Sequence, residues 1–166
     1  MTDADPAPGA FRLPPAAAWA LVAAQFVFLL LLGFMPWGSL WPRDVATLVI
    51  GLVLVALGVG IALAAGGALG RSLTPSPIPK VDGQLVTGGV YALVRHPIYS
   101  GLLVLGLGLV AIGASVLHLL AWAALLAVLM TKARFEERML ADQYPGYRDY
   151  AARVGRLVPG IGRVRS

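Results

Sequence analysis

Four apolar blocks, at residues 16–35, 45–69, 101–115 and 116–131, most constrain what this chain can fold into. A membrane-spanning helix needs roughly 20 mainly apolar residues. Of the 166 residues, 58% are hydrophobic and 13% are charged, and a soluble domain of this length cannot bury so much apolar surface. The chain is therefore predicted to be an all-α, polytopic integral membrane protein with four transmembrane helices.

The third and fourth blocks form one apolar tract that is too long for a single span and just long enough for two short ones. His118 interrupts this tract, and small residues weaken it near Gly113. We therefore expect a tight helical hairpin that turns near Gly113. Beyond it, a helix over 132–143 is predicted to leave the membrane, and Pro145 separates it from a second amphipathic helix over 147–154.

The basic residues predict the topology. If four helices span, twelve of the thirteen Lys and Arg residues lie on one side, eight of them after residue 131. By the positive-inside rule both termini are cytoplasmic, and the membrane is expected to be the cell inner membrane. The leader carries Asp3, Asp5 and only Arg12, so the first block is not expected to be a cleavable signal. The net charge of +5 thus follows topology and does not indicate a nucleic-acid partner.

This topology divides the chain into three parts: a cytoplasmic tail over 1–15, two transmembrane helices over 16–69, and a region over 70–166 that carries the candidate chemistry. The chain has no cysteine, which excludes disulfides and thiolate catalysis, and two histidines make a metal site an unlikely expectation. There is also no glycine-rich motif between a strand and a helix, so no Rossmann nucleotide site is predicted.

The first polar cluster lies directly before the third block and contains Tyr91, Arg95, His96 and Tyr99. Pro97 suits the first turn of a helix, so the third span is expected to begin there with its free N–H groups facing the cytoplasm. Such a helix end, flanked by Arg95 and His96, could hold a carboxylate or a phosphate. In the alternative interpretation Arg95 only snorkels and Tyr99 only anchors the interface.

The second cluster, Arg134, Glu136 and Glu137, follows the fourth block. Lys132 and Glu136 are four residues apart, which is an ordinary salt-bridge spacing on a solvated helix face. The hairpin, however, brings this cluster and the first one to the same cytoplasmic end. A cationic-aromatic group would then face an acidic group across a cleft suited to a zwitterion. Three tyrosines follow this cluster, namely Tyr144, Tyr147 and Tyr150. They are expected either to pack on the membrane surface or to cover the cleft as a lid.

Together these residues resemble the isoprenylcysteine carboxyl methyltransferase family and its relatives, the phospholipid N-methyltransferases. The resemblance covers about residues 70–160. It consists of a first motif, G-x-Y-x-x-x-R-H-P-x-Y-x-G over 89–101, and, after the predicted hairpin, R-x-E-E-x-x-L over 134–140. Two tyrosines and an R-x-x-P sequence over 156–159 follow in the same order. Residues 1–70 carry no matching motif, and the eukaryotic members have more spans, so this chain could accept a different lipid.

The resemblance implies a cytoplasm-facing pocket for S-adenosylmethionine and methyl transfer to a lipid or lipidated acceptor that enters from the bilayer. It implies that Glu136 or Glu137 takes the ammonium group of the cofactor. An acceptor carboxylate could be oriented by Arg134, whereas an amine acceptor would need one of the two glutamates as a base. The remaining residues that it places at the cofactor are Arg95, His96 and Tyr99 near the methionine part, and Gly89, Tyr91, Leu157 and Pro159 near the adenosine.

Carboxyl O-methylation of an isoprenylcysteine-like acceptor is the first expectation, and phospholipid N-methylation is its alternative. The family also resembles membrane sterol reductases that bind a nicotinamide cofactor, but no additional basic cluster for a second phosphate is visible here. A non-catalytic membrane scaffold, with a basic tail on anionic lipid, remains the other class.

Overall fold

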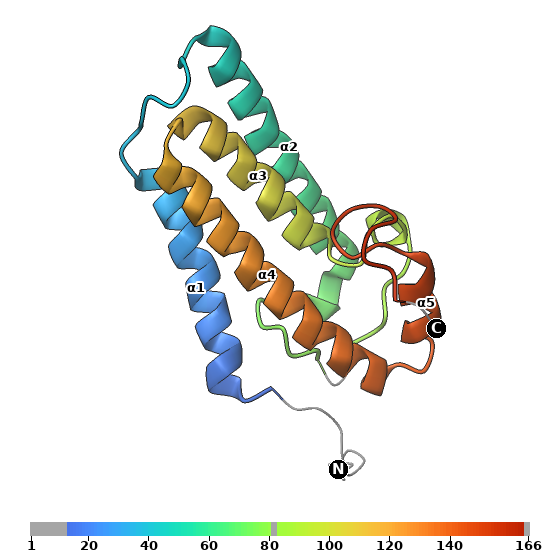
Figure 1. Ribbon diagram of the computed structural model, residues 1–166. Coiled ribbons are helices and arrows are strands. Elements are labelled where there is room, and N and C mark those ends of the chain that lie inside the picture. The colour runs from blue at the N-terminus through green and yellow to red at the C-terminus, as the bar shows by residue number, and fades with distance from the viewer. Residues whose placement is uncertain (1–12, 81–82, 165–166) are drawn as a thin grey trace.

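The computed structural model describes residues 13–80 and 83–164, and its regular structure there is helical (Figure 1). The all-α prediction is thus confirmed. The leader residues Asp3, Asp5 and Arg12 lie outside the described part of the chain. The helices are α1 (Pro15–Phe34), α2 (Val45–Leu69), α3 (Pro97–Gly113), α4 (Val116–Gln143) and α5 (Tyr147–Arg153), with short 3-10 turns at Gly70–Ser72 and Gly89–Ala92.

Three of these helices, α1, α2 and α4, are long and apolar enough to cross a membrane. The fourth apolar helix, α3, has 17 residues, which is about 26 Å at the α-helical rise and short of a hydrocarbon core of about 30 Å. The integral membrane class is therefore supported, while the number of four spans stays a prediction. The outer faces of α1 and α2 expose large apolar side chains such as Phe34 and Leu63, as helices in lipid do.

The hairpin between α3 and α4 forms where the sequence predicted it. Ala114 adopts a left-handed conformation with φ of 45° and ends α3, and the Ser115 hydroxyl then accepts from the Leu117 amide to cap α4. The loop between α1 and α2 is fixed to this turn, since the Gly38 amide donates to the Gly113 carbonyl at 2.7 Å. Both connections therefore lie at one end of the bundle, opposite α5 (Figure 1).

Helix α4 continues without a break from the hairpin to Gln143, so the apolar span and the charged extension are one helix. Pro145 then separates it from α5, as predicted. The core between α1, α3 and α4 contains fully buried Leu125 and Leu129 and nearly buried Leu32. This packing fixes the rotation of α4, and hence the direction in which each of its charged side chains points.

Helices α2 and α3 approach each other through glycines. A Cβ built on Gly58 would lie 2.4 Å from the Leu105 nitrogen and 2.5 Å from the Gly101 carbonyl oxygen. A Cβ built on Gly108 would likewise lie 2.5 Å from the Gly51 carbonyl oxygen. Small residues at helix interfaces permit backbone contact of this kind in membranes. The contact holds the start of α3, and with it the residues before Pro97, against α2.

We predict that Gly58→Ala destabilises the protein by about 1–3 kcal/mol, because the added methyl group forces two backbones apart. The matched control is Gly60→Ala on the same helix, where no atom lies within 4 Å of the added Cβ. Thermal unfolding in detergent measures both variants. Equal unfolding temperatures for the two would contradict the close α2–α3 contact.

Candidate active site

The carboxylate of Glu137 joins three segments of the chain. Its Oε1 accepts from Arg95 Nη2 at 2.8 Å and from Arg156 Nε at 2.9 Å, and its Oε2 accepts from Arg156 Nη2 at 2.7 Å. His96 Nε2 lies 3.2 Å from Oε1. Glu137, Arg95 and His96 are buried. The residues before α3, the far half of α4 and the segment after α5 are therefore held together by one ion cluster.

All of the N–H donors of the Arg95 side chain form hydrogen bonds inside the protein. A guanidinium has five N–H donors. Nε and Nη2 donate to Glu137, Nη1 donates to the carbonyls of Ala151 and Val154, and Nη2 also donates to the Gly162 carbonyl at 2.9 Å. Backbone contacts extend this attachment, since the Arg95 amide donates to the Gly155 carbonyl at 2.8 Å. Arg95 thus anchors the C-terminal segment beside the start of α3.

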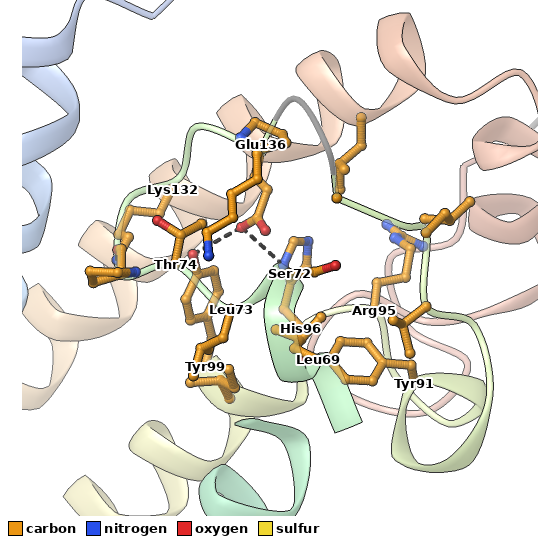
Figure 2. Close-up of a pocket in the computed structure, with 18 of the residues that line it drawn as sticks. Leu69, Ser72, Leu73, Thr74, Tyr91, Arg95, His96, Tyr99, Lys132 and Glu136 are labelled. Carbon is orange, nitrogen blue, oxygen red and sulfur yellow. Dashed lines mark hydrogen bonds and ion pairs between the residues drawn. The ribbon is translucent and has the colours of Figure 1, made fainter. Parts of the chain in front are cut away.

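A cavity of about 370 Å³ opens next to this cluster, a size typical of small-ligand sites (Figure 2). His96, Tyr99 and Glu136 meet in its wall: the Tyr99 hydroxyl donates to Glu136 Oε2 at 2.9 Å, and His96 Nδ1 lies 3.5 Å from the same oxygen. The His96 and Tyr99 rings are stacked with centroids 5.2 Å apart. The predicted meeting of the aromatic-basic group and an acidic group is therefore present at this end of the bundle.

Burial alone lowers the pKa of His96, but the contacts with Glu136 and Glu137 outweigh it and raise the pKa above its usual value. The imidazole therefore keeps its proton at a higher pH than an exposed histidine does. A protonated His96 donates from both ring nitrogens, which suits a position between two carboxylates. The same buried contacts also fix the ring that forms part of the cavity wall.

The predicted site residues divide into two groups. Five of them line the cavity, namely Tyr91, Arg95, His96, Tyr99 and Glu136. Of the others, Glu137 lies behind the wall in the ion cluster, and Arg134 is exposed beside a separate surface groove. The Leu157 carbonyl accepts from the Ser100 hydroxyl at 2.7 Å, and Gly89 and Pro159 are exposed. The five predicted residues that do not line the cavity are thus Gly89, Arg134, Glu137, Leu157 and Pro159.

The structure adds cavity residues that the sequence analysis did not select. Gln25 of α1, Lys132 and Tyr147 also line it, and Figure 2 shows Lys132 on the side of α1. The sequence offers a reason to select Gln25, because it is the one amide side chain in the apolar α1 segment. Polar residues within membrane spans are commonly functional. Tyr147, which the sequence analysis expects either on the membrane surface or covering the cleft, is buried and lines the cavity. Its hydroxyl has no hydrogen-bond partner within the described residues.

Replacing Arg95 by Ala is predicted to cost about 3–5 kcal/mol of stability, because Glu137 loses a buried partner and several carbonyls lose their donor. Arg95→Lys should recover only part of this, since an ammonium has three donors. The matched control is Arg153→Ala, whose side chain is exposed on α5. Thermal unfolding in detergent reports the effect for all of these variants. An Arg95→Ala protein as stable as the control would contradict the anchoring role.

The raised pKa of His96 predicts a pH dependence of stability. The stabilisation from its proton is complete below the unfolded value of about 6.5 and is lost as the pH rises through the higher folded value. Thermal unfolding between pH 5.5 and 9 should therefore differ between the unaltered protein and His96→Gln, with the advantage of the unaltered protein shrinking as the pH rises. An advantage that grows with pH would contradict protonation of His96.

Comparison with known proteins places this chain in a family. The family model described as phospholipid methyltransferase matches residues 46–146. A cobalt-zinc-cadmium resistance protein, CzcN, of Cupriavidus metallidurans is 33% identical over 152 residues, which are 89% of this chain and 64% of that protein. A nickel-cobalt-cadmium resistance protein, NccN, of Alcaligenes xylosoxydans xylosoxydans is 31% identical over 89% of this chain and 66% of its own length.

A probable protein-S-isoprenylcysteine O-methyltransferase of rice (Oryza sativa subsp. indica) is 34% identical over 116 residues, covering 68% of this chain and 61% of that protein. The chain thus spans slightly less than two thirds of the length of these relatives. The family model and the rice relative agree with the resemblance carried by the motifs. This chain belongs to the phospholipid methyltransferase family, which includes isoprenylcysteine methyltransferases.

Proposed function

We propose that this protein is an S-adenosylmethionine-dependent methyltransferase that acts on a membrane-embedded lipid or lipidated acceptor, by carboxyl O-methylation of an isoprenylcysteine-like substrate. The observation that carries the proposal is the cavity in which His96, Tyr99 and Glu136 meet within a membrane helix bundle. Membership of the family and the similarity to the rice isoprenylcysteine O-methyltransferase support the reaction type. The active site is proposed to face the cytoplasm, together with both termini.

The cavity residues fit the charges of the cofactor. Oε2 of Glu136 accepts from the Tyr99 hydroxyl, and Oε1 has no hydrogen bond within residues 13–80 and 83–164, so it can accept from the ammonium group. The buried Tyr147 hydroxyl, which has no partner within the described chain, can donate to a ligand in the cavity. We therefore assign the ammonium to Glu136. Arg95 and Glu137 position the wall, and the roles of Gly89, Leu157 and Pro159 near the adenosine stay predictions.

S-adenosylmethionine supplies an activated methyl group on a sulfonium. Methylation of a carboxylate forms one C–O bond and breaks one C–S bond, the electron pair of the broken bond stays on sulfur, and no proton moves. The chain's own residues then have to orient the two ligands and exclude water. Tyr99, fixed by Glu136 and by stacking on His96, is suited to this orienting role. The predicted role of Arg134 in holding an acceptor stays a prediction.

Phospholipid N-methylation is the second candidate, and the description of the matching family model favours it. An amine acceptor has to lose a proton during the reaction, and Glu136 is the candidate base in the cavity wall. The two candidates differ in what they require of Glu136. Carboxyl methylation requires it only for binding, whereas N-methylation requires it as a proton acceptor.

We predict saturable binding of S-adenosylmethionine to the detergent-purified protein, measured by calorimetry. Glu136→Gln should weaken it about 10-fold or more, because the ammonium loses a charged partner, and Tyr99→Phe should weaken it less. Arg153→Ala is the control for charge and should bind like the unaltered protein. No binding by a folded sample, or binding of NADPH in its place, would refute the methyltransferase assignment.

A further inference from the structure

Lys132 is a buried cation at the end of the cavity that faces α1. Its side chain is 1% exposed, and its ammonium donates to Gln25 Oε1 at 2.6 Å and to the Pro75 carbonyl at 3.2 Å. The ammonium also lies 5.1 Å from the centre of the Tyr99 ring. In Figure 2 Lys132 and Tyr99 lie on the side of the faint blue α1 ribbon, and Tyr91 and Arg95 lie at the opposite end.

The partners of Lys132 are all neutral. Within residues 13–80 and 83–164 no carboxylate lies within salt-bridge distance of its ammonium, and Glu136, one turn along α4, is bonded to Tyr99. Burying a cation without an anion is costly. A protein that only needed to fill this space could use an apolar side chain. The arrangement is therefore suited to a ligand that brings the missing negative charge.

The surroundings of Lys132 indicate which ligand that is. Phe26 and Leu29 of α1 line the same cavity and place apolar surface beside the ammonium. These residues and Gln25 lie inside a helix that is apolar enough to span the membrane. Of the cofactor-binding groups proposed above, Glu136 lies one turn beyond Lys132 on α4, and Tyr147 belongs to α5. An anion bound at Lys132 would therefore extend its attached chain along α1, as a lipid-like molecule would.

We propose that Lys132 binds the carboxylate of the methyl acceptor, with Gln25 holding the ammonium in position and the apolar chain of the acceptor lying against Phe26 and Leu29. This inference rests on the proposed function and assigns the acceptor end of the same cavity. The carboxylate loses its charge on methylation, so the neutral ester no longer pairs with Lys132 and leaves the site more readily than the substrate.

The test measures equilibrium binding to protein in lipid nanodiscs, corrected for empty nanodiscs. The probes are N-acetyl-S-farnesylcysteine, which carries a carboxylate, and its uncharged carboxamide. The unaltered protein should bind the carboxylate about 10-fold more tightly. This ratio should fall to near one in Lys132→Met, stay mostly intact in Lys132→Arg and fall partway in Gln25→Leu. The matched control is Thr131→Ala, whose hydroxyl bonds only within its own helix and which does not line the cavity.

Binding of S-adenosylmethionine to the same samples separates this inference from the proposed function. Lys132→Met should leave that affinity unchanged; a large loss with the carboxylate preference intact would assign Lys132 to the cofactor and overturn the inference. If the unaltered protein binds the carboxylate and the carboxamide equally well, the inference is overturned. This result needs no variant, so it does not depend on whether a variant folds. Lys132-dependent competition by phosphatidylethanolamine would overturn the assignment to a carboxylate. A preference for the carboxylate that depends on Lys132, in a protein that does not bind S-adenosylmethionine, would support the anion site and refute the proposed methyltransferase function.

Discussion

The buried contact of Glu137 with Arg95, His96 and Arg156 is the interaction on which the candidate site depends. It connects a position on α4 to the residues before α3 and to the chain after α5. The residues before α3 and the far half of α4 supply part of the cavity wall. The chain after α5 holds them through Arg156. Because an unpaired buried charge is so unfavourable, the cluster forms as a whole or not at all. The wall of the cavity therefore depends on this buried ion cluster as well as on apolar packing.

The membrane part of the protein completes this arrangement from the other side. The glycine contacts between α2 and α3 fix the start of α3, and the apolar core fixes the rotation of α4. His96, directly before α3, and Glu136, on α4, can then meet only in one geometry. The result is a cavity whose wall combines polar groups such as Glu136 with the apolar side chains of Phe26 and Leu29 on α1.

Local sequence signals predicted the framework of the fold well. Apolar blocks of spanning length located the helices, small residues located the hairpin turn, and Pro145 located the break before α5. The hairpin topology also brought the two charged clusters together correctly. The sequence could not decide how each side chain points. Neighbouring helical positions differ by about 100°, so Glu136 faces the cavity while Glu137 enters the ion cluster and Arg134 is exposed.

The same limitation explains why Lys132 and Arg95 differ from the roles that their spacing indicates. Lys132 has the spacing of an ordinary surface salt bridge with Glu136, yet packing of α4 against α1 turns it into the cavity beside Gln25. Arg95 looks like a ligand-binding cation, yet Glu137 and the C-terminal segment together use every one of its donors. Neither outcome follows from spacing, because both depend on contacts between residues more than 50 positions apart. Helix α1 lies outside the family-matched residues 46–146 and still supplies apolar side chains to the cavity wall. On the proposals made above, Lys132 in the matched region binds the acceptor carboxylate, and α1 adds Gln25 and the apolar side chains that contact the acceptor chain.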